Sequence, residues 1–408
     1  MTTQVSVLGG GYAGVMAANR LQRRGGIEVT LVSPTPDFVD RIRLHQMVTG
    51  THSGRQDYRR VLSPQVRRVH DRAERIDRGN RSVLLASGAR LRYDHLLLAV
   101  GSAGTSPDIA GAEHVQGVAT IGAAQQLRRV LARTAPGATV TVVGGGSTGI
   151  ETAAELATTG WRVTLACGGQ LGPSLHERGR RSAAAILHGL DVDVLEGTAG
   201  RVVAASATEV TLADGRARAS EVTVWATGFS VPDLAHSSGL ASDATGRLVT
   251  DETLTCVDDP RIVAAGDVAA PSGGAQRMSC QAAMPLGAQA AETILSRIAG
   301  DPPADLTNGF AGQCLSLGRR SGVLQLAHPD DTPRAVHLRG RPAAWAKEVT
   351  CRAVVRGLVT EARRPGSFRW PRDPGRAARP TRSEAEDEAR IASDPGAEVG
   401  AEVDGRVR

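Results

Sequence analysis

The sequence lacks the cysteine spacings that disulfide and zinc chemistry need. Its five cysteines (167, 256, 280, 314 and 351) form no C-x-x-C or C-x4-C pair, and their number is odd. Neither a disulfide framework nor a metal site is therefore indicated. Lysine is almost absent too, because Lys347 is the only one among the 48 basic residues. That bias reflects a GC-rich genome more than a function.

Aromatic residues and long apolar runs are scarce as well. Aromatics make up 3% of the chain and no aromatic-studded basic cluster accompanies the net charge of +6, so we expect no nucleic-acid partner. No run reaches the roughly 18 apolar residues of a membrane-spanning helix, and no signal peptide precedes the first strand-like run. These absences favour a cytoplasmic enzyme. A chain of 408 residues has room for two to three domains, at about 100–200 residues per domain.

What the sequence does have, near its start, is a glycine-rich turn between an apolar strand and a helix. Gly9, Gly11 and Gly14 follow the run VSVL at G-x-G-x-x-G spacing, and Tyr12 and Ala13 open the helix. The first glycine allows the tight turn, the second lets the backbone approach a pyrophosphate, and the third lets the helix pack on the strand. The free N–H groups at the helix start favour the negative charge of that pyrophosphate.

The chain repeats this unit, and the repetition makes the motif specific. Gly144, Gly146 and Gly149 stand at the same spacing after TVTVV, with Ser147 and Thr148 opening the next helix. In each half a second apolar strand and a hairpin-like stretch follow. We therefore expect two Rossmann-like units and two dinucleotide sites.

Each half then closes on an apolar strand that runs into glycine. The first closing strand ends at Ala99 to Gly101, and the second at Thr227 and Gly228. A later strand ends at Gly266–Asp267, where a carboxylate can accept hydrogen bonds from a sugar or ribityl hydroxyl. The run 278–300 is typical of a long helix beginning near Ser279, whose free N–H groups suit an electron-rich acceptor.

Beyond residue 300 the sequence predicts a small C-terminal region. Residues 343–359 have helical apolar spacing, with Glu348, Arg352 and Arg356 at i, i+4 and i+8. We interpret this segment as a helix docked on its own protein rather than as a membrane anchor. From about Gly375 the chain is rich in charged residues, alanine, glycine and proline without aromatics, which predicts a disordered tail.

Together these motifs resemble the two-dinucleotide flavoproteins of the pyridine nucleotide–disulfide oxidoreductase fold, over residues 4 to about 300. The GGGxTGIExAAEL form of the second motif is similar to type II NADH dehydrogenases and their apoptosis-inducing-factor relatives. GQCLSLGRRSG and RPGSFRWP are similar to actinobacterial proteins labelled NADH dehydrogenase, FAD-containing subunit. The resemblance implies an α/β fold in which the FAD domain is interrupted by the NAD(P)H domain. The implied division is FAD domain 1–103 and 229–300, NAD(P)H domain 104–228, C-terminal region 301–372 and disordered tail 373–408.

The resemblance also implies the site residues. FAD is expected to contact Gly9, Gly11, Tyr12, Ala13, Gly14, Ser33, Arg43, Ala99, Gly101, Gly266, Asp267 and Gln281. NADH or NADPH, as co-substrate, is expected to contact Gly144, Gly146, Ser147, Thr148, Gly149, Glu151, Thr227 and Gly228. The catalytic candidates are Glu151, which would orient the nicotinamide, and three residues of the acceptor side: His45, Arg43 and Gln281.

Some positions depart from the family pattern. Ser33 stands where the family has the acid for the FAD ribose, and Cys167 and Gly168 stand where NADH-specific relatives often carry glutamate. Arginines at 178, 180 and 181 follow and could meet a 2′-phosphate, so NADH and NADPH stay open. Gln281 matches the first glutamine of the A-Q-x-A-x-Q quinone signature, whereas Pro285 replaces the second and weakens that assignment.

Without paired cysteines, we expect direct hydride transfer from nicotinamide C4 to flavin N5. Electrons would then pass to a quinone or another small acceptor, including oxygen. Two other readings stay open: a flavoenzyme of specialised-metabolite biosynthesis, and a nucleotide-binding redox sensor with poor turnover. We expect a monomer or homodimer, with peripheral contact at the inner face of the cell membrane left open.

Overall fold

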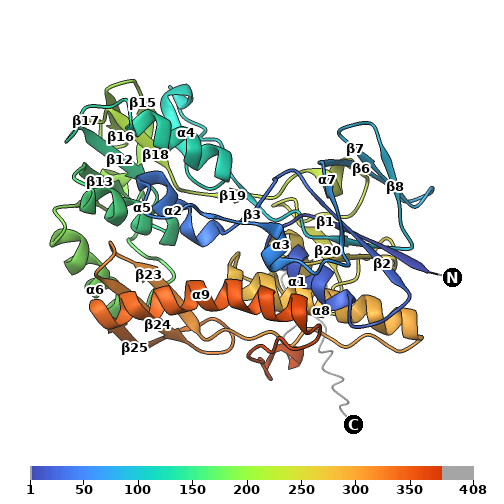
Figure 1. Cartoon of the computed structure of the whole chain (residues 1–408). Coiled ribbons are helices and arrows are strands. Elements are labelled where there is room, and N and C mark those ends of the chain that lie inside the picture. The colour runs from blue at the N-terminus through green and yellow to red at the C-terminus, as the bar shows by residue number, and fades with distance from the viewer. Residues whose placement is uncertain (1, 379–408) are drawn as a thin grey trace, which may run out of the picture.

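The computed structural model describes residues 2–378. Two lobes, each built on a five-stranded parallel sheet, lie next to each other, and one long C-terminal helix runs beneath both (Figure 1). This arrangement confirms the predicted α/β class with two Rossmann-like sheets. Within the described range, no helix combines the length and the apolar character needed to cross a bilayer.

The first sheet combines early and late segments of the chain in the order β21-β9-β1-β2-β5. Its strands are β1 (Thr3–Leu8), β2 (Ile27–Ser33), β5 (Arg67–His70), β9 (His95–Leu98) and β21 (Ile262–Ala264). Helix α1 (Tyr12–Leu21) follows β1 and packs on α8 (Cys280–Ala299). A Cβ on Gly287 would lie 2.2 Å from the Ala13 carbonyl oxygen, so this close helix packing needs glycine.

The second sheet repeats the design in the order β11-β18-β12-β13-β14. Its strands are β11 (Val115–Gly117), β12 (Thr139–Val143), β13 (Arg162–Ala166), β14 (Asp193–Leu195) and β18 (Val222–Trp225). The helices of this lobe are α4 (Ile121–Leu131), α5 (Ser147–Thr158) and α6 (Glu177–His188). The buried faces of these helices and strands form the core of the lobe.

Each predicted hairpin-like stretch is a three-stranded antiparallel sheet, because the strand before the hairpin joins it. The first consists of β6 (Ala73–Asp77), β7 (Ser82–Leu85) and β8 (Arg90–Arg92), and the second of β15 (Val202–Ala205), β16 (Glu209–Leu212) and β17 (Ala217–Ala219). Short paired strands complete the lobes: β3 (Phe38–Val39) with β4 (Arg55–Gln56), and β20 (Leu248–Thr250) with β22 (Ala269–Pro271).

The chain crosses between the lobes through two antiparallel strands, β10 (Ala103–Gly104) and β19 (Phe229–Ser230). The predicted boundaries at 103/104 and 228/229 fall in or next to these strands. A second connection is α2 (Leu44–Thr49), which leaves the first lobe and packs on α4 and α5 of the second. The remaining helical turns are α3 (Tyr58–Val61), α7 (Leu234–Ser237), η1 (Arg41–Arg43), η2 (Ala112–His114), η3 (Gly197–Gly200) and η4 (Gly266–Val268).

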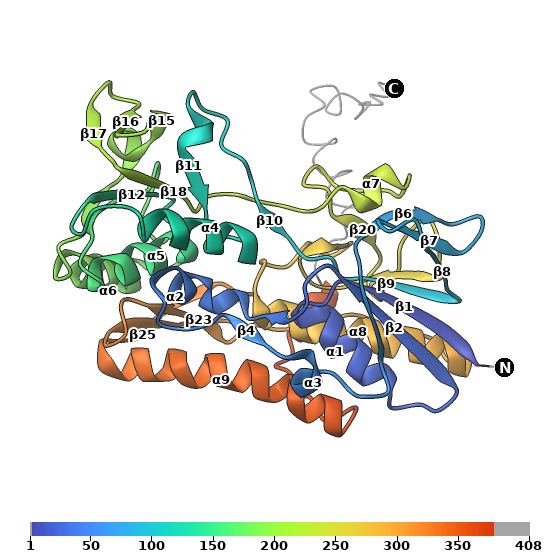
Figure 2. The same cartoon turned by 45° about the horizontal axis from the view of Figure 1, so that its top comes forward.

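The C-terminal region touches both lobes. Its sheet of β23 (Gly312–Ser316), β24 (Gly322–Ala327) and β25 (Pro333–Arg339) packs on α5 and α6, whereas α9 (Arg341–Arg363) also reaches α1 and α3 (Figure 2). The predicted helix at 343–359 is therefore longer, beginning after Gly340 and ending at Arg363, just before Pro365.

The predicted start of the tail at residue 373 is wrong. Arg376 is buried, its guanidinium pairs with Glu252 at 2.8 Å, and the turn η5 (Arg376–Ala378) follows Asp373, whose N–H donates to the Thr307 carbonyl. Residues 373–378 therefore have a defined structure, held by buried charge pairing in place of apolar packing. The rest of the predicted tail, 379–408, lies outside the described residues.

Candidate active site

The first glycine motif leaves a space that no protein atom fills. Gly9 has φ +112°, and a Cβ there would lie 2.1 Å from the Ala99 carbonyl oxygen. A Cβ on Gly14 would lie 1.8 Å from the Gly9 carbonyl oxygen. The fold itself therefore requires these two glycines. Around Gly11, in contrast, a Cβ would meet nothing within 4 Å.

The second motif has the same pattern. Cβ atoms on Gly144 and Gly149 would come within 2.8 and 1.8 Å of backbone carbonyl oxygens, whereas one on Gly146 would meet nothing within 4 Å. Gly11 and Gly146 are the N-caps of α1 and α5, and neither helix has an acidic residue in its first turn. Both open spaces therefore fit the pyrophosphate of a dinucleotide at a helix N-terminus.

At the end of β2 a tyrosine hydroxyl joins the serine that replaces the usual acid. The Tyr58 hydroxyl lies 2.9 Å from the Gly10 carbonyl oxygen and 3.1 Å from Ser33 Oγ, and both side chains are buried. Thr35 Oγ1 lies 3.1 Å from Ser33 Oγ as well, so a ribose at this strand end would meet hydroxyl groups. Sequence reasoning missed Tyr58, because it lies 25 residues after Ser33 and is brought back by the fold.

The ends of β9 and β21 bring Asp267 together with two partners. Ser102 Oγ donates to the Asp267 carboxylate at 2.6 Å, and the Arg41 guanidinium lies 3.5 Å from the same oxygen. Gly101 precedes this cluster at φ +71°. Arg41 is therefore the arginine that pairs with Asp267 at this edge, and its guanidinium has the geometry to bind a diphosphate.

Arg43 is committed elsewhere. Its guanidinium makes two hydrogen bonds to Glu348 of α9, at 2.9 and 3.0 Å, and a third to the Gln46 amide oxygen. Burial lowers the pKa of Arg43, but Glu348 outweighs this and leaves that pKa above its usual value. These bonds tie the 41–49 segment to α9, and the role of Arg43 at FAD or the acceptor stays a prediction.

Tyr12 is likewise occupied within the protein. Its hydroxyl donates to Asp40 Oδ1 at 2.5 Å, and burial raises the pKa of both groups. Ala13 contacts α8 through Gly287 rather than facing open space. In the first turn of α1, backbone N–H groups rather than the side chains of these two residues remain available to a ligand.

Glu151 lies in a buried cluster that contains the chain's one lysine. Its Oε1 lies 2.8 Å from Lys347 Nζ and accepts the Ser316 N–H at 2.8 Å, while Oε2 lies 3.8 Å from His45 Nδ1. Burial raises the pKa of Glu151, but Lys347 and His45 outweigh it and hold that pKa below its usual value. Burial lowers the Lys347 pKa, whereas Glu151 raises it by more, so both groups stay charged.

His45, a predicted catalytic residue of the acceptor side, is buried in the same cluster. Burial lowers the pKa of His45 to about 4, against the opposing effect of Glu151. The imidazole is therefore neutral near pH 7, and its buried Nε2 has no hydrogen-bond partner within the described chain. It can still accept or pass a proton as a neutral group, but it supplies no positive charge.

Side chains from three helices, α8, α9 and α5, bond to the backbone along the edge of β23. Gln281 of α8 donates to the Gly312 carbonyl at 2.7 Å, once its amide is oriented to satisfy both hydrogen bonds. Lys347 donates to the Cys314 carbonyl at 3.1 Å, and Glu151 accepts from Ser316. Alternate residues of one edge strand thus direct their unpaired backbone groups to these three side chains.

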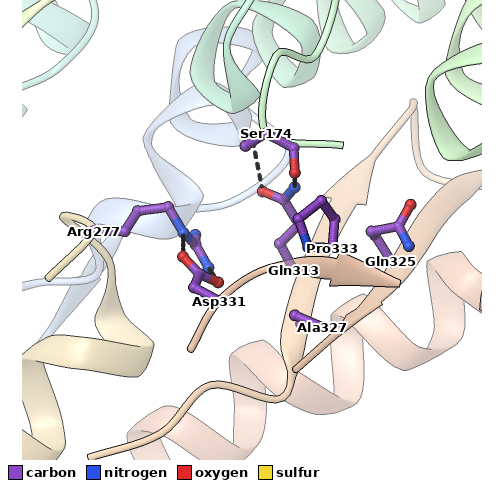
Figure 3. A pocket seen from close by; sticks show the side chains of 8 residues that line it. Ser174, Arg277, Gln313, Gln325, Ala327, Asp331 and Pro333 are labelled. Carbon is purple, nitrogen blue, oxygen red and sulfur yellow. Dashed lines mark hydrogen bonds and ion pairs between the residues drawn. The ribbon is translucent and has the colours of Figure 1, made fainter. Parts of the chain in front are cut away.

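Neither the cysteines nor the detected cavities provide another centre. All five cysteines are free, and burial raises the pKa of Cys280 to about 11, so its thiol is protonated. Figure 3 shows a cavity of about 20 Å³ between Ser174, Gln313, Gln325 and the Arg277–Asp331 ion pair. A second of about 270 Å³ lies beside residues 273–277. Neither borders the glycine motifs or Glu151, and among the described residues no cluster of three or more metal-ligating side chains occurs.

Known proteins share this architecture over most of the chain. A family model described as pyridine nucleotide-disulphide oxidoreductase matches residues 3–287. An NADH dehydrogenase-like protein of Mycobacterium tuberculosis is 32% identical over 376 residues, covering 85% of this chain and 92% of the relative. The type II NADH:quinone oxidoreductase of that organism is 30% identical, covering 74% of each chain. The structure of Plasmodium falciparum NDH2 in complex with NADH superposes with a TM-score of 0.72 at 15% identity, covering 90% of this chain and 99% of that one.

Proposed function

Because the chain belongs to the pyridine nucleotide-disulphide oxidoreductase family, we propose that it passes electrons from NAD(P)H, by way of FAD, to a quinone. That it is an FAD-dependent oxidoreductase using NAD(P)H follows from the family and the relatives. The identity of the electron acceptor goes beyond what the family and the relatives give. What supports a quinone is the charged cluster of Lys347 and Glu151 next to Gln281 on the β23 edge.

The two dinucleotides are assigned to the two open glycine positions. FAD would be held at Gly11, Ser33, Tyr58 and the Arg41–Asp267 pair, and NAD(P)H at the start of α5, with Gly146, Ser147 and Thr148, and at Thr227 and Gly228. FAD held there would supply the hydride chemistry with NAD(P)H and the release of electrons singly or in pairs. No redox-active cysteine pair is included in this route, because the five cysteines have no C-x-x-C or C-x4-C spacing.

The residues of the β23 edge supply charge and order on the acceptor side. Lys347 holds a buried positive charge that influences Cys280, the first residue of α8. A fixed cation favours an acceptor that gains negative charge, as a quinone does on reduction. Glu151 keeps Lys347 charged, and Gln281 fixes the start of α8 on β23.

We propose further that the exposed face of α9 contacts the membrane that holds the quinone. Trp345 is 70% exposed and Val349, one turn later, is 43% exposed. Arg352 and Arg356 continue the same face, and this face of four residues is what we call the α9 outer face. An exposed tryptophan beside arginines is typical of a helix that lies on an anionic interface.

Steady-state oxidation of NADH and NADPH against water-soluble quinones, ferricyanide and oxygen tests the acceptor. We expect quinone turnover to exceed oxygen turnover by about tenfold or more, and Lys347→Met or Gln281→Ala to slow it while anaerobic flavin reduction stays near normal. Arg216→Met, which removes an exposed partner of Asp214 far from the β23 edge, is the control. Equal rates with quinone and oxygen would contradict the quinone assignment. Slow reoxidation by every acceptor would favour the redox-sensor reading.

A further inference from the structure

The second lobe carries a carboxylate at its nucleotide-facing edge, although β13 ends without one. Strands β13 and β14 pair in parallel with Ala166 opposite Leu195, so Cys167 and Glu196 follow at the same level. The Cys167 N–H donates to the Leu195 carbonyl at 2.8 Å, which keeps the two strand ends together. Ligands of such sheets bind outside the carboxyl ends of the strands.

Glu196, which follows β14, is held in place by the loop that follows β13. Its Oε1 accepts the Leu171 N–H at 2.6 Å. The same loop is closed against its surroundings by two backbone hydrogen bonds of 2.7 Å, from Gly172 to the Gly145 carbonyl and from Gly197 to the Gly169 carbonyl. Gly145 belongs to the second glycine motif, so the carboxylate is held beside the place where that motif receives its ligand.

The other carboxylate oxygen of Glu196 is available. Its side chain is exposed, and no ion pair within residues 2–378 engages it. Together with burial, Glu196 raises the pKa of Cys167 to about 12, so the thiol at this strand end stays uncharged and Glu196 is the charge there.

The neighbouring arginines are less well placed. Arg181 pairs with Glu177 at 3.5 Å on the exposed side of α6, and Arg178 lies exposed in the first turn of that helix. Two arginines are competitors. Arg180 has a buried Nε without a hydrogen-bond partner within the described chain, and the Cα of Arg201 would lie 3.9 Å from a Cβ on Gly168. A 2′-phosphate would gain Arg201 but would meet the fixed negative charge of Glu196.

We infer that Glu196 sets the preference of this chain for NADH over NADPH, by accepting a hydrogen bond from the adenosine ribose and repelling a 2′-phosphate. In the family pattern the acid that recognises this ribose stands at the end of β13. Here Glu196 stands at the end of the neighbouring strand, β14. The inference rests on the proposed assignment of NAD(P)H to the second lobe. It names a specificity residue that the strand-end position alone does not reveal.

Calorimetric titration of the FAD-loaded protein with ADP-ribose and 2′-phospho-ADP-ribose tests the inference without turnover. The wild type should bind ADP-ribose at least about tenfold more tightly. Glu196→Gln keeps an oxygen for the Leu171 N–H and removes the charge, so it should bring the two affinities to within about threefold. Glu209→Gln, which alters an exposed acid of β16, is the matched control and should change neither affinity.

A Gly146→Val variant distinguishes a failure of the Glu196 inference from a failure of the assignment of NAD(P)H to the second lobe. If Gly146→Val abolishes binding of both probes but Glu196→Gln leaves their ratio as in the wild type, the inference fails while the nucleotide site stands. If both probes still bind to Gly146→Val, the site assignment fails and the inference with it. A wild type that prefers 2′-phospho-ADP-ribose, with the preference lost in Arg201→Ala, would also overturn the inference.

Discussion

At the scale of single residues, the glycines divide into those that the backbone requires and those that a ligand requires. Gly9 and Gly144 have positive φ and clash with carbonyl groups if given a Cβ, whereas Gly11 and Gly146 face open space. A side chain at the latter positions therefore leaves the fold intact and fills the ligand's place. This separation allows each nucleotide site to be removed on its own.

We expect Gly146→Val to retain FAD while blocking flavin reduction by NAD(P)H, and Gly11→Val to prevent flavin loading. Flavin absorbance after purification and anaerobic stopped-flow reduction measure the two effects. Gly25→Val is the control, because Gly25 also faces open space but lies beyond the end of α1. The reverse result, FAD lost from Gly146→Val and kept by Gly11→Val, would exchange the two sites.

The sequence was sufficient to predict the positions of these glycines, but not the side chains that the fold brings to the two sites. Glycine spacing reports on local backbone geometry, so both turns were predictable. Tyr58, Arg41 and Lys347 act through contacts that only the tertiary fold creates. The one available signal for Lys347 was its being the single lysine of an arginine-rich chain.

His45 gives the molecule a pH-dependent stability. Its pKa is about 4 in the folded chain, below the roughly 6.5 of an unfolded histidine, so the unfolded state binds more protons between these values. The contribution is complete above pH 6.5 and is lost as pH falls toward 4. Between about pH 7 and pH 5 this amounts to about 2 kcal/mol.

Urea unfolding at these two pH values measures that contribution. His45→Gln should lose less stability than the wild type between them, because glutamine does not titrate and Glu151 and Lys347 keep their charges over this range. His188→Gln, which alters an exposed histidine, should keep the wild-type difference. An unchanged difference in His45→Gln would show that the imidazole is protonated in the folded chain.

At the scale of elements, caps were easier to predict than partners. Ser279 caps α8 as expected, because its hydroxyl accepts the Ala282 N–H at 3.2 Å. The apolar stripe of α9 also packs inward, with Cys351, Val355 and Leu358 buried. The role of the β23 edge was not predictable, because its unpaired backbone N–H and C=O groups bond to side chains from α5, α8 and α9.

The α9 outer face makes a prediction of its own. The protein should sediment with vesicles rich in anionic lipid, more weakly at high salt, because exposed arginines act through screened charge. Trp345→Ser with Val349→Ser should weaken this binding, and Arg352→Gln with Arg356→Gln should weaken it about fivefold or more. Val257→Ser, which alters a valine that is 58% exposed in the first lobe, is the matched control. Equal binding of all four proteins, or equal binding to neutral vesicles, would contradict a specific contact.

At the scale of the whole molecule, the C-terminal region joins the lobes into one unit. Its sheet contacts the second lobe, where His337 Nε2 lies 2.9 Å from Ser182 Oγ. Its helix contacts the first lobe, where Arg20 of α1 pairs with the buried Glu361 at 2.7 Å. Domain order along the chain could be predicted, but this mutual burial depends on contacts between residues 155 and 341 positions apart.

This joining predicts that the chain unfolds in a single cooperative transition. The chain has four tryptophans, so the test uses a variant in which Trp161, Trp345 and Trp370 are replaced by phenylalanine. The remaining Trp225 lies in the second lobe and its fluorescence reports on that lobe, whereas flavin release reports on the first. Both should give the same midpoint in this single-tryptophan background. Arg20→Met leaves the Glu361 carboxylate without its cation and should cost about 3–5 kcal/mol. In a cooperative molecule that loss lowers both midpoints together, although Trp225 is far from the change in sequence. If Arg20→Met moves the flavin midpoint and leaves the Trp225 midpoint in place, the lobes unfold separately and the C-terminal region does not couple them.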